Sequence, residues 1–232
     1  MPANSVATAL AGEAAALSAA LAGLTAADLD RASPCRPWTA GELTCHVIIG
    51  ARRIGQALRG PDDPAATLIT TVGYYRPDER FSPAVDADRI TAARELARRL
   101  GGPDAIRAEL ALACAESVKL LSRAPAGRTV RTRHGDWMLL TDFARTRVVE
   151  LALHGLDLAV ALDRPPWLTG ASASVLEELL LPGGNAARLG AELGCDRTAL
   201  IAMLTGRAVP APAEAAVIAR AQVTRLALGQ PA

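Results

Sequence analysis

Apolar residues recur every three or four positions along most of this 232-residue chain, which is the period of an amphipathic helix. Proline and glycine interrupt the pattern, for example at Gly60-Pro61 and between residues 101 and 103. The segment 125–140 contains a short alternating run, and we expect a loop with some extended structure there. The pattern predicts long helices at 4–23, 39–59, 86–100, 103–123 and 141–162. Shorter helices are expected near 172–181, 185–193, 196–204 and 212–226.

This order of elements predicts an all-α fold. We expect an up-down four-helix bundle in residues 1–164 and a small, mostly helical C-terminal extension in residues 165–232 that packs on it. Composition favours helices, because half of the residues are apolar but only 3% are aromatic. We find no internal repeat and no low-complexity linker.

Charge and cysteine usage narrow the functional classes. The net charge is +1, and no basic stripe interleaved with aromatic residues marks a nucleic-acid binder. The N-terminal residues do not form a signal peptide, and no window supplies the roughly 18 apolar residues of a membrane span. The four cysteines show neither Cys-x-x-Cys spacing nor a secreted disulfide pattern. The sequence therefore predicts a soluble, cytoplasmic protein that binds neither nucleic acid nor membranes.

The expected helix at 141–162 carries one polar stripe. Glu150 and His154 lie four residues apart, so that their Cβ atoms are roughly 5–6 Å from each other on one face. Arg147 and Asp157 extend the stripe in the two directions, and the rest of the circumference is apolar, as in a buried helix. Buried carboxylates and imidazoles persist only when paired, hydrogen-bonded or bound to metal. The pattern alone leaves open a second interpretation, an ordinary solvated stripe in which Arg147 and Glu150 form a surface ion pair.

His46 is a third candidate metal ligand. Thr39 and Glu42 have the spacing of a capping box, and Trp38 before the cap can pack onto Leu43. His46 then falls in the second turn of the helix, on a mostly apolar face that we expect to point inward. The alternative is a core histidine that is hydrogen-bonded to a carbonyl group.

Three segments resemble one known family. Residues 34–39 (Pro-Cys-Arg-Pro-Trp-Thr) with 43–46 (Leu-Thr-Cys-His), and the run 146–158, are similar to the two signature segments of the mycothiol-dependent maleylpyruvate isomerase family, a branch of the DinB-like helical bundles. Residues 204–207 resemble that family's C-terminal Leu-Thr-Gly-Arg stretch, and the resemblance covers roughly residues 5–210. It implies a DinB-like bundle in which His46, Glu150 and His154 hold a divalent metal, usually zinc.

Such a ligand set determines the chemistry only in part. Two imidazoles and one carboxylate leave at least one coordination position open, as in catalytic zinc sites. Zinc at such a site can activate either a thiol or water. The resemblance implies mycothiol, and a metal-bound thiolate that attacks an electrophilic small molecule, with cis–trans isomerisation or S-transfer as the outcome. A zinc metallohydrolase and a non-catalytic, metal-stabilised binding module remain the alternatives.

Supporting roles are assigned to four further residues. As a catalytic candidate, Asp157 is expected either to orient the ring of His154 or to pair with a nearby arginine. Arg147, the second candidate, is expected either to bind a substrate carboxylate or to hold Glu150 in place. Arg207 matches the family's C-terminal arginine, which implies a place at the mouth of the active site, binding a carboxylate of the substrate or part of the thiol cofactor. Trp38 is expected to pack beside the helix cap and to form a pocket wall on the cofactor side.

Further expectations concern His134, the binding partners and the C-terminal extension. We expect His134 to be a surface or pocket-rim residue and not a ligand. The partners are expected to be mycothiol and a small electrophile of carboxylic-acid type, with the protein a monomer or a homodimer. The C-terminal extension is expected to differ from the larger, mixed α/β C-terminal part of maleylpyruvate isomerase, so the sequence leaves the substrate open.

Overall fold

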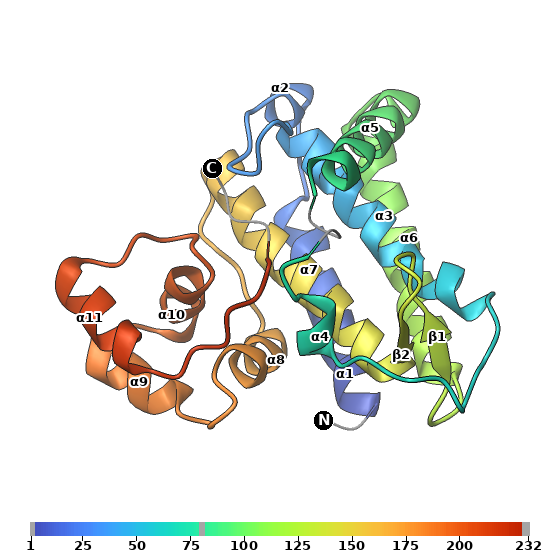
Figure 1. The fold of residues 1–232 in the computed structure, drawn as a ribbon. Coiled ribbons are helices and arrows are strands. Elements are labelled where there is room, and N and C mark those ends of the chain that lie inside the picture. The colour runs from blue at the N-terminus through green and yellow to red at the C-terminus, as the bar shows by residue number, and fades with distance from the viewer. Residues whose placement is uncertain (1–2, 79–81, 229–232) are drawn as a thin grey trace.

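Four long helices form the bundle in this computed structural model, which describes residues 3–78 and 82–228 (Figure 1). They are α1 (Ala3–Ala20), α3 (Ala40–Leu58), α6 (Pro103–Arg123) and α7 (Leu140–Leu162). Each packs on two neighbours, in the order α1, α6, α3, α7 and back to α1. A fifth helix, α5 (Pro83–Leu100), packs mainly on α3 from outside this ring. The predicted all-α four-helix bundle is therefore confirmed.

The ends of these helices follow the signals in the sequence. The hydroxyl of Thr39 accepts a hydrogen bond from the backbone N–H of Glu42, and the Glu42 carboxylate accepts one from the backbone N–H of Thr39. This is the predicted capping box, and it places His46 in the second turn of α3. Gly101 ends α5 in the left-handed region at φ 72°, and Pro103 begins α6.

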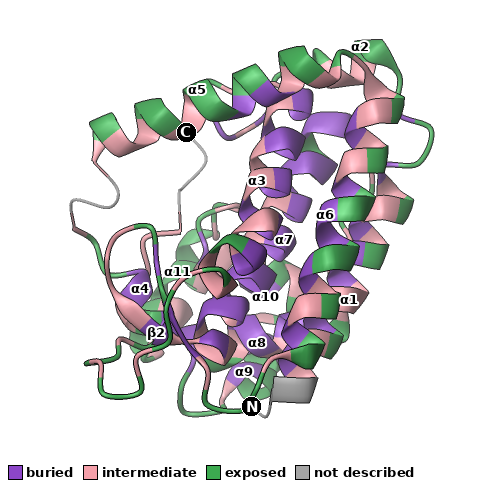
Figure 2. Ribbon diagram, turned by 90° about the vertical axis from the view of Figure 1, so that its right-hand side faces the viewer, coloured by how far each residue is buried: buried purple, intermediate pink, exposed green. Residues whose placement is uncertain are grey.

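Burial is greatest along α7, which lies in the interior of the bundle (Figure 2). The polar stripe on this helix is not solvated, since only 3% of Arg147 and 2% of Asp157 are exposed. The interpretation of the stripe as a solvated face is therefore wrong. Its polar groups must find partners inside the protein.

Short elements connect the long helices. They are α2 (Ala26–Leu29), α4 (Thr71–Tyr74), and the antiparallel hairpin of β1 (Thr129–Arg131) and β2 (Trp137–Leu139). The hairpin confirms the extended structure expected at 125–140. The two four-residue helices were not predicted, because one turn is too short to show a period.

The C-terminal extension consists of α8 (Gly170–Leu180), α9 (Ala186–Leu193), α10 (Arg197–Leu204) and α11 (Pro212–Arg220). Helix α8 packs on α1 and α7, and α10 packs on α8. The expected helix at 212–226 is too long, since α11 ends at Arg220 and an irregular segment returns to the bundle. In that segment the N–H of Ala227 donates to the carbonyl of Tyr75, directly after α4. The division of the chain near residue 164 stays a prediction.

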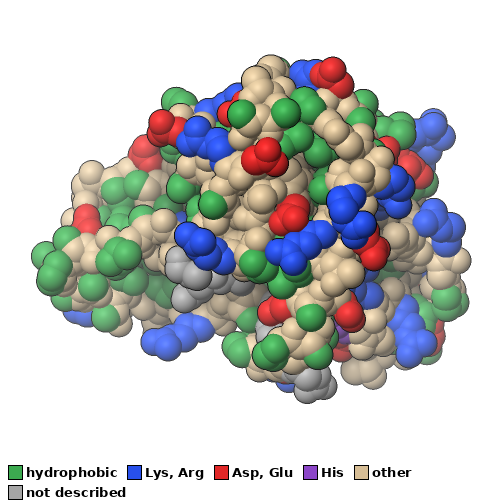
Figure 3. Space-filling view, turned by 90° about the horizontal axis from the view of Figure 1, so that it is seen from above, with side chains coloured by type: hydrophobic (Ala, Val, Ile, Leu, Met, Phe, Trp, Pro, Cys, Tyr) green, Lys and Arg blue, Asp and Glu red, His purple; other side chains and the backbone are tan. Residues whose placement is uncertain are grey.

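Basic and acidic side chains intermingle on the face that Figure 3 shows, with no single large patch of either sign. Among the described residues, no helix is both long and apolar enough to cross a membrane.

Candidate metal centre

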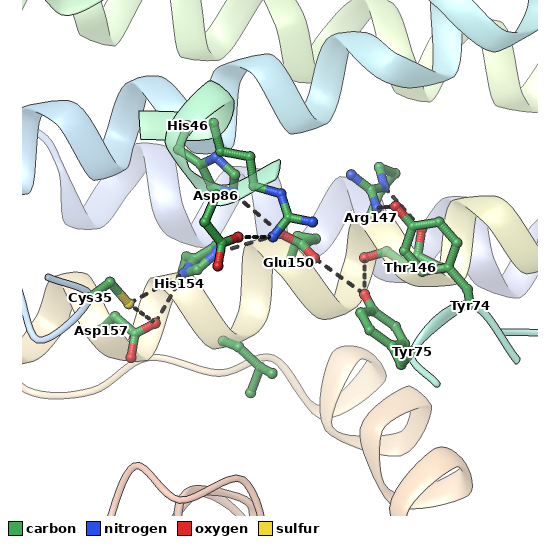
Figure 4. A network of polar contacts seen from close by, with 12 residues as sticks. Cys35, His46, Tyr74, Tyr75, Asp86, Thr146, Arg147, Glu150, His154 and Asp157 are labelled. Carbon is green, nitrogen blue, oxygen red and sulfur yellow. Dashed lines mark hydrogen bonds and ion pairs between the residues drawn. The ribbon is translucent and has the colours of Figure 1, made fainter. Parts of the chain in front are cut away.

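His46 from α3 and Glu150 and His154 from α7 converge at one point (Figure 4). Their ligand atoms all lie within 4.8 Å of one another. The Oε2 atom of Glu150 is 3.6 Å from Nε2 of His46 and 3.5 Å from Nε2 of His154. The two imidazole rings meet edge to face, with centroids 5.1 Å apart. The structure thus brings together the three residues that the sequence offers as metal ligands.

The spacing and chemistry of these donors suit a small divalent cation. Two ligands at about 2.1 Å from a tetrahedral zinc ion lie about 3.4 Å from each other. Both observed separations to Glu150 are close to this value and longer than good hydrogen bonds. Nδ1 of His154 is 3.0 Å from Oδ2 of Asp157, so a proton on Nδ1 leaves the lone pair of Nε2 directed at the cluster.

A positive charge between Glu150 and Asp157 would stabilise both carboxylates. Burial lowers the pKa of His46 to about 4, which keeps this ring neutral at pH 7. Burial opposes the charge on Glu150, but the contacts with His154 and His46 and the charge of Arg147 hold the pKa of that carboxyl well below its usual value. Burial also opposes a charge on His154, but Asp157, Cys35 and Glu150 hold its pKa well above the usual value. Either a proton on His154 or a metal ion can supply the charge between the two carboxylates.

Asp157 has the contact with His154 that the sequence predicts. Its Oδ2 atom also accepts hydrogen bonds from Sγ of Cys35 at 3.1 Å and from Nη2 of Arg207 at 2.9 Å. Sγ of Cys35 lies 3.9 Å from Nδ1 of His154, on the side of the ring away from Glu150. No role was predicted for Cys35, although it lies in one of the segments that resemble the family, because 119 residues separate it from His154 and local spacing does not reveal the contact.

The structure places Arg207 differently from the expectation. Its guanidinium is 4% exposed and pairs with Asp157, where Nε lies 2.9 Å from Oδ1. Neither Arg207 nor Asp157 is among the described residues that line the cavity in front of the cluster. The predicted place of Arg207 at the mouth of the site is therefore corrected to a place behind His154.

A cavity of about 430 Å³ lies in front of the three candidate ligands. Trp38 forms part of its wall, as predicted, and its indole stacks on the ring of His46 with centroids 4.6 Å apart. His134 also lines the cavity and is not one of the clustered ligands. Ala227 and Leu228 of the C-terminal segment complete the lining on another side.

Tyr75 holds Glu150 from the side opposite the histidines. Only 2% of Tyr75 is exposed, and its hydroxyl lies 3.0 Å from the carbonyl oxygen of Thr146 and 3.4 Å from Oε1 of Glu150. No role was predicted for Tyr75 from the sequence, because the residues around it show no helical or strand period. The contact depends on how α4 packs on α7.

Arg147 lines the same cavity without a carboxylate partner. Its Nε donates to the hydroxyl of Thr146 at 3.0 Å, Nη2 donates to the hydroxyl of Tyr74 at 3.4 Å, and the guanidinium lies over the ring of Phe143. Within the described ranges, no carboxylate lies close enough to form an ion pair with it. The expected ion pair with Glu150 is therefore not formed, although the charge of Arg147 does lower the pKa of that carboxyl.

Fold and site together define a helical-bundle protein with a partly buried His–Glu–His cluster that faces a cavity. The chain belongs to the family described as the mycothiol maleylpyruvate isomerase N-terminal domain, whose model matches residues 10–159. No curated protein matches the chain.

Two solved structures share the fold. A crystal structure of the mycothiol-dependent maleylpyruvate isomerase is 16% identical with a TM-score of 0.59, and that of a variant with one histidine replaced by alanine is 14% identical with a TM-score of 0.58. Each match covers 90% of this chain and 90% of the other. Most of the C-terminal extension is therefore included, and the expected difference in the size of that part is not found.

Proposed function

We propose that this protein is a zinc-dependent enzyme that uses mycothiol to transform a small electrophilic molecule, by isomerisation or by S-transfer. The observation that carries the proposal is the His46, Glu150 and His154 cluster, which faces a cavity in a chain of this family. A cytoplasmic location belongs to the proposal, because all four cysteines are free thiols.

The three residues would hold zinc through two imidazole nitrogens and one carboxylate oxygen. Bound zinc would keep the sulfur of a coordinated thiol deprotonated. Structural zinc sites usually have four ligands, many of them cysteines, whereas this cluster has three. Cys35 does not complete it, because its thiol lies on the Nδ1 side of His154 and bonds to Asp157. The open position then faces the cavity.

Two residues of the chain hold the ligands in place. Trp38 stacks on His46 and restricts rotation of that ring. The hydroxyl of Tyr75 donates to the Thr146 carbonyl at 3.0 Å and lies 3.4 Å from Oε1 of Glu150, so it limits the movement of that oxygen, while Oε2 is directed at the two histidines. The ligands are therefore arranged before any ion arrives, as an efficient metal site requires.

Arg147 supports a substrate that carries a carboxylate. Its buried guanidinium has no carboxylate within ion-pair distance among the described residues, so it is available to form charge-assisted hydrogen bonds when a carboxylate enters the cavity. Arg53 lines the cavity too, and burial together with the neighbouring arginines Arg133 and Arg147 lowers its pKa to about 10. An anion near these residues would relieve their mutual repulsion. We therefore propose a small, carboxylate-bearing electrophile.

Metal content measured by mass spectrometry tests the metal part of the proposal. We expect about one zinc ion per chain in the wild type and none in Glu150→Gln. The control is Glu177→Gln, which changes an exposed ion pair on α8 and should keep the metal. If the wild type takes up no zinc from a zinc-containing buffer, the cluster is a protein-only polar network and the proposed function is rejected.

Cobalt substitution tests the thiol part. Mycothiol should change the visible spectrum of the cobalt form, whereas the disulfide of mycothiol, which has no free thiol, should not. A metal-loaded protein whose spectrum does not respond to mycothiol would contradict the use of this thiol. Ester or amide hydrolysis without added thiol would then identify the site as a water-activating one.

A further inference from the structure

Arg207 of the C-terminal extension reaches the back of the candidate metal centre. It follows α10, and its guanidinium lies beside α7 with 4% of the side chain exposed. Nη2 donates to Oδ2 of Asp157 at 2.9 Å, and Nε lies 2.9 Å from Oδ1 as an ion-pair contact. A charge-assisted hydrogen bond to one oxygen and a close ion-pair contact at the other restrict both the position and the rotation of the carboxylate.

The turn after α10 aims this arginine at α7. Gly206 adopts a φ of 73°, in the left-handed region, and the N–H of Arg207 donates to the carbonyl of Ala202 at 2.8 Å. This six-to-one bond is typical of the Schellman motif that ends a helix at glycine. Nη1 of Arg207 donates to the carbonyl of Thr205 at 3.4 Å, and Nε donates to that of Leu153 on α7 at 3.3 Å. Two backbone carbonyls, one in its own turn and one on α7, therefore hold Arg207 beside Asp157.

Asp157 in turn orients the ring of His154. Its Oδ2 atom lies 2.9 Å from Arg207 and 3.0 Å from Nδ1 of His154, so one oxygen contacts both residues. A carboxylate that is fixed at both oxygens sets the direction of the hydrogen bond from the imidazole ring. That direction determines where Nε2, on the opposite side of the ring, points.

We propose that Arg207 is a positioning residue for the metal centre: through Asp157 it fixes the ring of His154 so that Nε2 faces His46 and Glu150. The inference rests on the proposed function, because it assigns Arg207 a role toward the proposed metal. It gives the C-terminal extension a part in metal binding although its described residues contribute no atom to the cluster.

Arg197, at the start of α10, offers a matched control in the same extension. It forms an ion pair with Glu177 through two parallel hydrogen bonds, both at 2.7 Å. This pair is on the surface, where 48% of the Arg197 side chain is exposed. Its removal takes away the same kind of ion pair from the extension without touching the contacts of Asp157.

Zinc affinity, measured with the metal alone by competition with a chromogenic chelator, tests the proposal. Arg207→Ala should weaken zinc binding by about 10- to 100-fold, the usual effect of losing a residue that supports a metal ligand. Arg207→Lys keeps the charge, but one ammonium group cannot contact both oxygens of Asp157 and the Leu153 carbonyl in this geometry, so the variant should still bind zinc roughly 10-fold more weakly. Arg197→Ala should remain within about twofold of the wild type.

Two further measurements separate positioning from general destabilisation. Circular dichroism of the metal-free variants shows whether they are folded, and the cobalt spectrum at saturating metal should shift in Arg207→Ala but not in Arg197→Ala. A merely structural role would lower the unfolding temperature and leave the spectrum of the folded fraction unchanged.

The possible results distinguish a failure of the positioning role of Arg207 from a failure of the proposed function. A folded Arg207→Ala variant with wild-type zinc affinity overturns the positioning role and leaves the proposed function standing. If Arg207→Ala does not fold, wild-type affinity in Arg207→Lys has the same meaning. Absence of zinc binding in the wild type rejects the proposed function, and the positioning role with it.

Discussion

The two ends of the polar stripe on α7 are equally buried but differ in how their charges are paired. At one end, Oδ2 of Asp157 accepts hydrogen bonds from His154, Cys35 and Arg207, and Oδ1 lies 2.9 Å from Nε of Arg207. At the other end, the hydrogen bonds of Arg147 within the described part of the chain go to the hydroxyls of Thr146 and Tyr74. Depth in the protein therefore does not distinguish them, since 2% and 3% of the two residues are exposed.

This difference distinguishes residues that hold the candidate metal ligands in place from residues that can bind a substrate. A buried charge that the fold neutralises, as at Asp157, stabilises the native state and holds its neighbours. Arg147 has no carboxylate within ion-pair distance among the described residues. Burial opposes its charge, but the hydroxyl of Tyr74 and the more distant carboxylate of Glu150 raise its pKa, so the guanidinium stays charged and can bind a ligand of opposite sign. Glu150 lies between the two ends of the stripe. Its Oε2 atom contacts the two histidines, and its Oε1 atom lies near the hydroxyl of Tyr75.

The largest effect is expected at the paired end. Asp157→Asn removes the counter-ion of the buried Arg207, and the metal-free protein should lose about 3–5 kcal/mol of unfolding free energy in urea denaturation. The same change in the exposed pair, Glu177→Gln, should cost at most about 1 kcal/mol. Equal costs in the two variants would show that burial of the Asp157 pair adds nothing, and the proposed support would not exist.

Removal of metal should have the next largest effect on stability. With free zinc at 100 times its dissociation constant, a chelator should lower the unfolding free energy by about 2.7 kcal/mol. For a chain of this size that is a fall of roughly 5–10 °C in the unfolding temperature, measured by calorimetry. Glu150→Gln should show no response to the chelator. An equally unresponsive wild type would mean that the cluster is already satisfied by its own hydrogen bonds.

The sequence predicted the stripe on α7 because four-residue spacing is a local property of a helix. Glu150, His154 and the contact of Asp157 with the His154 ring follow from helical geometry, and the capping box of α3 follows from Thr39 and Glu42. For the same reason the helix boundaries in the bundle were predicted closely, with α6 confirmed at both ends.

What the sequence did not predict depends on packing between distant segments. The partner of Arg207 is chosen by how α10 lies beside α7, and the resemblance placed this arginine at the wrong side of His154. Tyr75 and Cys35 lie in irregular segments where no period signals their direction. The helix expected up to residue 226 ends early because the N–H of Thr224 bonds to the carbonyl of Leu180 and the segment is drawn out along the bundle.

Tyr74, which contacts Arg147, and Tyr75, which contacts Glu150, allow the same comparison with smaller expected effects. Tyr75→Phe removes a buried hydroxyl that contacts the Thr146 carbonyl and Glu150, and it should lower the unfolding free energy by about 1 kcal/mol. Tyr74→Phe removes only the 3.4 Å contact with Arg147 and should cost about half as much. Zinc affinity should fall severalfold in Tyr75→Phe alone, because only this variant frees Glu150. If the two variants bind zinc equally well, Tyr75 does not hold the ligand.

The smallest change in stability is expected at the unpaired end, from Arg147→Met. The variant loses the stacking of the guanidinium over Phe143 at 5.2 Å, worth up to about 1 kcal/mol, but no longer buries an unpaired charge. These effects oppose each other, so the unfolding free energy should stay within about 0.5 kcal/mol of the wild type.

Binding of an anion should respond to the same substitution far more strongly. Loss of a charge-assisted hydrogen bond worth about 1.5–3 kcal/mol should weaken the binding of a small dicarboxylate such as fumarate by roughly 10- to 100-fold, measured by calorimetry on the zinc-loaded protein. Arg131→Met, which changes an exposed arginine outside the lining of the main cavity, should leave this affinity unchanged. A stability loss as large as that of Asp157→Asn would place Arg147 with the supporting residues, and unchanged anion affinity would mean that the substrate's charge is bound elsewhere in the cavity.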